Sequence, residues 1–133
     1  MLAGLIALTI AFSGSTTTVP SIAPVPPAQT VQQYIEEYFK DTPVMIEIAR
    51  CESQFQQFNK TGKPVKNPKS SAIGVFQIMA SIHQDLADEK LGLDITTLEG
   101  NMAYAKVLYK DSGTVPWNDS KSCWGKSEKI AKK

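Results

Sequence analysis

The stretch RCESQF at residues 50–55 places Glu52 directly after Cys51, one of only two cysteines in the chain. A glutamate in a partly apolar setting retains its proton near neutral pH, because burial disfavours the carboxylate form. Such a group can donate a proton to a leaving oxygen, which is the step that breaking a glycosidic bond requires. A solvated helix carboxylate has no such property. The chemistry of Glu52 therefore depends on whether the fold buries it.

The helix expected around Glu52 begins with Thr42 as N-cap and Pro43 at its first position. Apolar residues then recur at steps of four and three, which predicts a buried stripe made of Val44, Ile48, Cys51, Phe55 and Phe58. At about 100° per residue, Glu52 lies about 80° from the centre of this stripe and toward the helix C-terminus, where the dipole disfavours negative charge. Glu47 lies about 60° away on the other side. The periodicity alone therefore does not choose between the two carboxylates.

Four further elements are expected from local patterns. Thr30 followed by Gln33 is a capping-box pattern that begins a helix before residue 40. A turn-rich segment follows the Glu52 helix, and a small hairpin is expected around Thr61–Gly62. The next helix is stopped by Gly92, and the one after it ends at Gly113. The side chains expected to face inward from this last helix are Leu98, Met102, Ala105, Leu108 and Tyr109.

Length and charge indicate a single domain with no electrostatic signature of a nucleic-acid partner. The chain has 133 residues, with 14 basic and 13 acidic groups, so no nucleic-acid binding is expected. We divide it into a signal peptide or N-terminal membrane segment (1–23), a Pro-rich linker (24–29), a folded domain (30–126) and a basic tail (127–133). The tail is either solvated or held against an anionic surface.

The N-terminal segment predicts export. Leu2 to Phe12 is an uncharged apolar run followed by small residues, which is typical of a secretory signal, although no Lys or Arg precedes the run. Spanning a bilayer takes about 20 apolar residues, and this run is shorter. We expect a secreted or cell-envelope protein, with membrane association through this segment as a possibility that the sequence leaves open.

The two cysteines fit an oxidising compartment. There Cys51 and Cys123 have a single intramolecular pairing. Closing so long a loop would stabilise the fold by roughly 4 kcal/mol in the chain-entropy treatment. The alternative is a pair of buried free thiols in a cytosolic protein. The chain has no CxxC pattern and only one histidine, His83, so we expect no metal site and no cofactor.

Three segments together carry a resemblance to a known family. They are ESQF at 52–55, SSAIGVFQIM at 70–79 and NMAYAKVLY at 101–109. Their order and spacing resemble the lysozyme-like domain of soluble lytic transglycosylases over residues 42–110. The ending of small exported members is similar to the set formed here by Trp117, Ser120, Cys123 and Trp124. The resemblance implies a mainly α, lysozyme-like α+β fold, with a small β-hairpin beside the substrate cleft. A monomer is expected.

The resemblance also implies roles for single residues. Glu52 would act as general acid and then general base in cleaving the β-1,4 bond between N-acetylmuramic acid and N-acetylglucosamine of peptidoglycan. Ser53 would orient the substrate or the acid. Gln77 would turn its amide toward the sugar cleft, and Gly74 would let the backbone approach the sugar. Tyr109 aligns with a family tyrosine and is also expected to be a substrate-binding residue.

Of three ring side chains near these motifs, two have two interpretations each. Trp117 is either a platform on which a sugar ring stacks or a core residue that packs near the disulfide. Trp124, next to Cys123, is expected to pack against the disulfide. His83 is expected to be a partly exposed helix histidine, with a position in the cleft as the alternative.

The chain departs from the family pattern in two places, which bear on the reaction. VPWNDS at 115–120 replaces the usual Ala-Tyr-Asn stretch. The sequence also shows no obvious catalytic aspartate at a fixed spacing from Glu52, as a lysozyme that activates water would need. This favours substrate-assisted chemistry, with a 1,6-anhydromuramyl product, over hydrolysis. A true lysozyme that uses Asp85, Asp88 or Asp94 as its second group is one alternative. A catalytically inactive wall-binding module that uses the same cleft is the other.

Overall fold

The computed structural model describes residues 28–131, with side chains as far as Lys126. The predicted segment 1–23 and most of the predicted linker lie outside the described residues. The elements in chain order are α1 (Val31–Tyr38), α2 (Pro43–Ser53), β1 (Ala72–Ile73), β2 (Ile78–Met79), α3 (Ala80–Leu91), α4 (Leu98–Ser112), the 3-10 helix η1 (Val115–Ser120) and α5 (Lys121–Ala131). The fold is therefore mainly helical with one small antiparallel sheet, as the sequence predicts.

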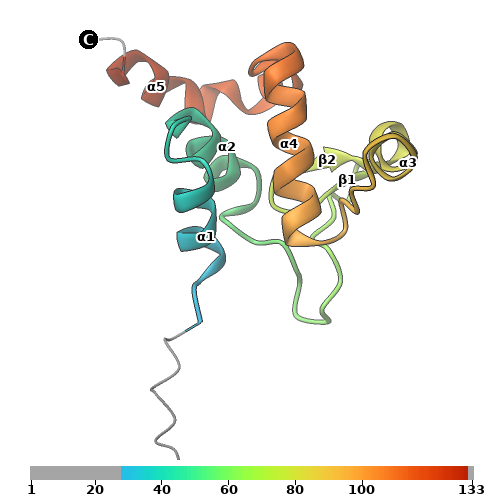
Figure 1. Cartoon of the computed structure of the whole chain (residues 1–133). Helices are drawn as coiled ribbons and strands as arrows, with labels where there is room; N and C mark the ends of the chain where they lie inside the picture. The colour runs from blue at the N-terminus through green and yellow to red at the C-terminus, as the bar shows by residue number, and fades with distance from the viewer. Residues whose placement is uncertain (1–27, 132–133) are drawn as a thin grey trace, which may run out of the picture.

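Helix α4 stands at the centre of the arrangement in Figure 1, with α1 and α2 on one side and the sheet and α3 on the other. Helix α5 returns to α2, with which it makes its main contacts. Among the helices of the described part of the chain, none combines the length and the apolar character needed to cross a membrane.

Helix α1 begins as the sequence predicts. The Thr30 side chain accepts a hydrogen bond from the Gln33 backbone N–H, and the Gln33 side chain accepts one from the Thr30 backbone N–H. These two bonds satisfy donors that the first helical turn leaves without a partner. Ile35 and Phe39 then turn inward and are fully buried.

Helix α2 begins at Pro43, with Thr42 before it, but it is shorter than the predicted stripe requires. It ends at Ser53, because Gln54 and Phe55 adopt left-handed backbone conformations with φ of 55° and 61°. Phe58, predicted to be buried, is 46% exposed. The prediction failed because apolar residues beyond the helix end were included in the period.

The corrected inward stripe of α2 contains Met45, Ile48 and Ala49, all fully buried. Glu52 follows Ile48 by four residues and Met45 by seven, which is the spacing of one helical face. Glu52 therefore lies on the core-facing stripe itself, one turn beyond the last buried apolar residue.

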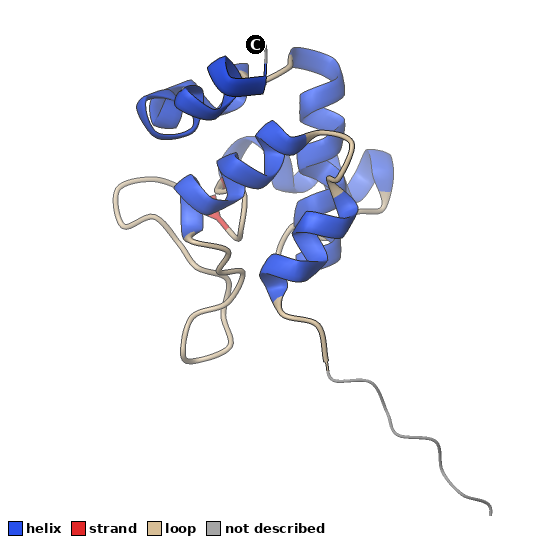
Figure 2. Cartoon of the chain, turned by 90° about the vertical axis from the view of Figure 1, so that its left-hand side faces the viewer, coloured by secondary structure: helices blue, strands red, loops and turns tan. Residues whose placement is uncertain are grey.

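The segment between α2 and β1 is a long loop, drawn in tan in Figure 2. The turn expected around Thr61–Gly62 is present, closed by a hydrogen bond from Asn59 N to Lys63 O at 2.8 Å and by one bridge between Phe58 and Pro64. The named strands lie further on, where β1 and β2 pair antiparallel with Ala72 opposite Met79. The predicted hairpin is therefore a turn with a single bridge, and the regular sheet is formed by residues 72–79.

Helices α3 and α4 end at Gly92 and Gly113, as predicted, each with positive φ. The predicted inward face of α4 is confirmed: Met102 and Ala105 are fully buried, and the other members pack against the core. The members that remain partly exposed are Leu98, Leu108 and Tyr109. Helix α5 continues to Ala131, so the backbone of most of the predicted basic tail is helical.

The turn between β1 and β2 is buried, and side-chain amides satisfy its backbone. Asn101 donates to Ile73 O at 3.2 Å and accepts from Phe76 N at 3.0 Å. Gln57 accepts from Val75 N at 2.8 Å. Both amides are almost completely buried, at 0% and 1% exposure. Because a buried backbone group without a partner costs about 1–3 kcal/mol, these two side chains are essential to the turn.

Gly74 is required in this turn for two separate reasons. Its φ is 75°, and a Cβ built there would lie 2.3 Å from the Asn101 amide nitrogen and 2.8 Å from the Gln57 amide oxygen. Gly62 has a similar φ of 77° but open space around it. We expect Gly62→Ala to lower the free energy of unfolding by about 1–2 kcal/mol through backbone strain alone. Gly74→Ala should cost a further 1–3 kcal/mol, roughly, through overpacking.

Urea denaturation of the two variants and the parent protein measures this difference. Equal losses in the two variants would show that the amides move aside at no cost, and would contradict the tight packing of Asn101 and Gln57 around Gly74.

Candidate active site

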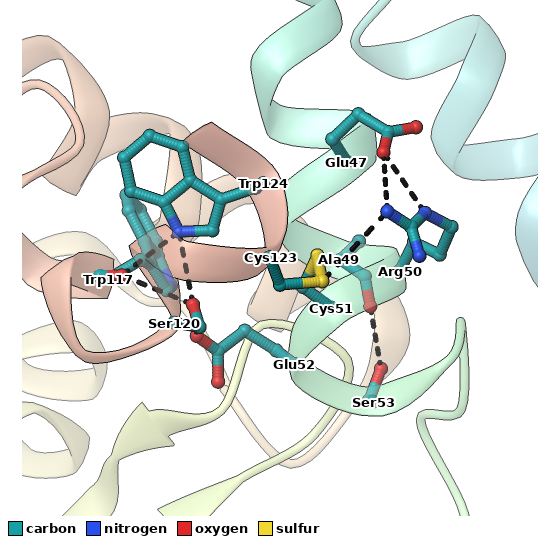
Figure 3. Close-up of a disulfide and its surroundings, with 10 residues drawn as sticks. All are labelled: Glu47, Ala49, Arg50, Cys51, Glu52, Ser53, Trp117, Ser120, Cys123 and Trp124. Atoms are coloured by element: carbon teal, nitrogen blue, oxygen red, sulfur yellow. Dashed lines mark hydrogen bonds and ion pairs between the residues drawn. A yellow bond between two sulfur atoms is a disulfide. The ribbon is translucent and has the colours of Figure 1, made fainter. Parts of the chain in front are cut away.

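Glu52 lies in the last turn of α2, half-buried, with its carboxyl group turned toward the C-terminal part of the chain. The Ser120 hydroxyl, at the end of η1, donates a hydrogen bond to Glu52 Oε1 at 2.5 Å. Figure 3 shows the two side chains pointing at each other from separate elements. The contact joins residues 68 positions apart, so only the tertiary structure brings them together.

Ser120 is itself held by a buried tryptophan. Trp124 has no exposed surface, and its indole Nε1 donates to Ser120 Oγ and to Trp117 O, both at 3.0 Å. A second acceptor for the serine hydroxyl, Trp117 O, lies 3.1 Å from Ser120 Oγ. The position of Ser120 is therefore fixed by groups that are themselves packed in the core.

The predicted disulfide is confirmed, and it spans the same contact. Cys51 and Cys123 are bonded, with their Cα atoms 6.0 Å apart. Cys51 immediately precedes Glu52, and Cys123 follows Ser120 by three residues, about one helical turn. Beyond its stabilisation of roughly 4 kcal/mol, the bond tethers α2 to α5 directly beside the carboxyl group and its serine partner. In Figure 3 it lies between the two helices next to the Glu52–Ser120 pair.

The pKa of Glu52 is raised above the ordinary value for a glutamate, and the largest cause is burial of the carboxyl group. The negative charge of Asp119 raises this pKa further, while the hydrogen bond from Ser120 opposes the shift by stabilising the carboxylate. The position of Glu52 in the last turn of α2 also raises its pKa, because that helix end carries partial negative charge. Glu52 therefore retains its proton to a higher pH than a solvated glutamate.

Glu47, which the sequence period did not distinguish from Glu52, has a different environment. Its carboxylate pairs with Arg50 at 2.8 Å, one turn along the exposed side of α2. A guanidinium on the surface of the helix therefore engages the Glu47 carboxylate. Of the two glutamates, the one with the protonation behaviour of a general acid is Glu52.

The aspartates considered as partners for Glu52 lie elsewhere. Asp85 and Asp88 are on α3, which Figure 1 shows on the other side of α4 from α5. Asp94 accepts hydrogen bonds from the Thr96 backbone and hydroxyl, which lower its pKa. It lines an open pocket of about 440 Å³ between α1 and the start of α4, and Glu52 does not line that pocket. The carboxylate whose charge acts on Glu52 is Asp119.

Ser53 performs a structural task beside Glu52. Its hydroxyl donates to Val75 O at 2.8 Å, also lies 3.2 Å from Ala49 O, and accepts from Gln56 N. In Figure 3 it points away from the Glu52 carboxyl group. Ser53 therefore fastens the end of α2 to the buried turn after β1, and a contact of this residue with substrate stays a prediction.

Gln77 and Gly74 are also engaged within the protein. Gln77 has a left-handed backbone, and its side-chain Nε2 donates to Gly74 O at 2.9 Å and to Val65 O at 3.3 Å. Gly74 is buried, and the side chains that approach it within the protein are Asn101 and Gln57. Tyr109 is half-buried on α4 and packs against the core. Substrate contacts of Gln77 and Tyr109 stay predictions.

Trp117 is a core residue, so of its two interpretations the structure supports packing and not a sugar-stacking platform. It is 3% exposed, its indole N–H donates to Phe76 O at 2.9 Å, and its ring meets the edge of Phe76. A sugar-stacking platform must expose a ring face, and this ring exposes almost nothing. His83, in contrast, is partly exposed on α3, as expected, and it contacts the Tyr104 hydroxyl at 2.9 Å.

Sequence reasoning missed the role of Ser120, the proximity of Asp119 and the burial of Gln57. Ser120 was part of the family-like ending, but the 115–120 segment has no period from which its direction is readable. Gln57 follows the end of α2, beside Gln54 and Gln56, and nothing in the local sequence separates the buried glutamine from the exposed ones.

Comparison of the chain with protein-family models, with curated proteins and with solved structures found no match. Within residues 28–131, no group of three or more His, Cys, Asp or Glu side chains is arranged to hold a metal ion. The case for a function therefore rests on the geometry around Glu52 and on the sequence resemblance.

The raised pKa of Glu52 predicts a pH-dependent cost to the fold. A carboxyl group whose folded pKa exceeds its unfolded value contributes stability below the unfolded pKa, and this is lost as pH rises through the folded pKa. Glutamine mimics the protonated form and retains an oxygen for Ser120. We therefore expect Glu52→Gln to match the parent protein at about pH 3.5, below the ordinary glutamate pKa, and to exceed its free energy of unfolding at about pH 7.

Urea denaturation of both proteins at the two pH values measures this difference. Glu89→Gln on the exposed side of α3 controls for the loss of one negative charge. A Glu52→Gln variant that is no more stable than the parent at neutral pH would mean that the carboxylate bears no burial cost.

Proposed function

We propose that this chain is a lytic transglycosylase that cleaves the β-1,4 bond between N-acetylmuramic acid and N-acetylglucosamine in peptidoglycan. The observation that carries the proposal is the state of Glu52, a half-buried carboxyl group whose pKa burial raises and whose oxygen is held by Ser120. Such a group suits an acid that must hold a proton near neutral pH. The resemblance of the three sequence segments around it supplies the substrate class.

The proposed reaction uses Glu52 twice. The protonated carboxyl group donates its proton to the glycosidic oxygen, the bond from that oxygen to C1 of the muramyl sugar breaks, and the leaving sugar departs with a free hydroxyl. The C6 hydroxyl of the same muramyl sugar then bonds to C1 and gives its proton to the Glu52 carboxylate. The products are a 1,6-anhydromuramyl end and a regenerated acid, and no water is consumed.

The proposal extends to the setting of the enzyme. The apolar N-terminal run and the disulfide are together consistent with export to the cell envelope or beyond, where the peptidoglycan substrate is located. No metal or organic cofactor is required by the reaction as written. We propose that the chain acts as a monomer on glycan strands.

The decisive measurement is the clearing of purified cell wall by the Glu52→Gln variant. General acid–base catalysis contributes about 10²–10⁴-fold, so we expect clearing to fall by at least about a hundredfold, while sedimentation with insoluble wall is retained. Glu47→Gln is the matched control, since it changes the other glutamate of α2 and should leave clearing within a few-fold. Clearing by Glu52→Gln at the parent rate would overturn the proposal. A parent protein that binds wall but never clears it would favour an inactive wall-binding module.

A hydrolytic lysozyme is the second candidate, and one observation favours it. Asp119 is close enough for its charge to act on Glu52, and a second carboxylate that activates water is what an inverting glycosidase needs. Mass spectrometry of the digested wall separates the two reactions. We expect 1,6-anhydro ends, and we expect them to persist in Asp119→Asn. Reducing ends that disappear in Asp119→Asn would assign the protein to the hydrolases.

A further inference from the structure

We propose that Ser120 is a positioning residue that holds the Glu52 carboxyl group in one place in both of its protonation states. The inference rests on the proposed function, in which Glu52 acts first as an acid and then as a base. A group with that double role must not swing away when it loses its proton, since the second step begins from the ionised form. The hydrogen-bond geometry around Ser120 provides such a hold.

In the ionised state, Ser120 donates its single proton to Glu52. Ser120 Oγ contacts both Glu52 Oε1 and Trp117 O, and the carboxylate is the stronger acceptor of the two. The Trp124 indole meanwhile donates to a lone pair of Ser120 Oγ at 3.0 Å. Indole is a donor only, so it never competes for the serine proton.

In the protonated state, Glu52 and Ser120 remain hydrogen-bonded, but Glu52 becomes the donor and Ser120 the acceptor. The Glu52 carboxyl O–H donates to Ser120 Oγ, and the serine hydroxyl turns its proton to Trp117 O. Serine oxygen has two acceptor lone pairs, so it accepts from Glu52 and Trp124 together. Glu52 Oε1, Ser120 Oγ, Trp117 O and Trp124 Nε1 each have a partner in both states, and no heavy atom needs to move.

Ser120 is surrounded by buried side chains and a disulfide, and few charged groups lie on the elements packed around it. Trp117 and Trp124 are buried, and the disulfide lies one turn beyond Ser120. Of the charged groups on the packed elements, Asp119 on η1 acts on Glu52, and Glu47 on α2 is paired with Arg50. The described lysines of α5, Lys121 and Lys126, are exposed.

The test compares Ser120→Ala with Ser120→Thr, which retains a hydroxyl, and with Ser122→Ala, which removes an exposed serine two residues further on, in α5. Glu52 is titrated in the full chain by carboxyl ¹³C NMR, a measurement that needs no enzymatic activity. The kcat and KM for solubilised glycan strands are measured in parallel, with pH profiles, and folding is checked by thermal denaturation.

In Ser120→Ala we expect the Glu52 titration to move to higher pH. Both protonation states lose a hydrogen bond with Ser120, and the bond to the ionised form is the stronger one. We expect kcat to fall roughly ten- to a hundredfold, the equivalent of one hydrogen bond to a charged group, with KM nearly unchanged. The pH profile of kcat should shift in the same direction as the titration. Ser120→Thr should restore both values, and Ser122→Ala should match the parent.

An unshifted Glu52 titration in a folded Ser120→Ala protein overturns the inference, whatever the activity. A shifted titration with parental kcat overturns the positioning role and leaves the proposed function intact. Clearing of cell wall by Glu52→Gln at the parent rate overturns the proposed function instead. The acid–base cycle on which the role of Ser120 rests then fails as well. The titration still reports whether Ser120 and Glu52 are hydrogen-bonded.

Discussion

The backbone between β1 and β2 turns inside the core, and the remainder of the structure is arranged to satisfy it. Val75 and Phe76 are fully buried, yet their peptide groups do not pair within the sheet. Side chains from four separate parts of the chain bind these groups and the neighbouring carbonyl, and they are Ser53, Gln57, Asn101 and Trp117. Because each unpaired buried peptide group would cost more than one hydrogen bond contributes, this turn requires α2, the following loop, α4 and η1 to meet at one place.

Two of these four side chains also determine the geometry at Glu52. Ser53 fastens the end of α2 to Val75 O, and Glu52 is the residue before it. Trp117 fastens η1 to Phe76 O, and Ser120 lies one turn further on. The glutamate and its hydrogen-bond partner are thus both attached, through a neighbour in sequence, to the same buried turn. The disulfide makes a second connection, between α2 and α5, the helix that follows η1. The carboxyl group is held at a core border without itself being part of the hydrophobic packing.

This arrangement places opposing influences on one carboxyl group. Burial and the charge of Asp119 favour the protonated form, and the Ser120 hydroxyl favours the ionised one. In the reaction that we propose, Glu52 acts first as an acid and then as a base, and such a group works best when neither form is overwhelmingly stable. The fold bears a cost for retaining an ionisable group at this border, which is the usual relation between a reactive site and stability.

The sequence alone determined several helix starts and ends, because these depend on neighbouring residues. The capping box at Thr30, the helix start at Pro43 and the glycine ends at Gly92 and Gly113 all follow from backbone chemistry within a few positions. With export assumed, two cysteines also left a single disulfide pairing. The sequence did not determine where α2 ends. The predicted buried stripe therefore included apolar residues that lie beyond the helix. Only the tertiary structure decided that Trp117 is core, that Gly74 makes room for two amides, and that Ser120 meets Glu52. Each of these depends on contacts between segments far apart in the chain, and no local period records such contacts.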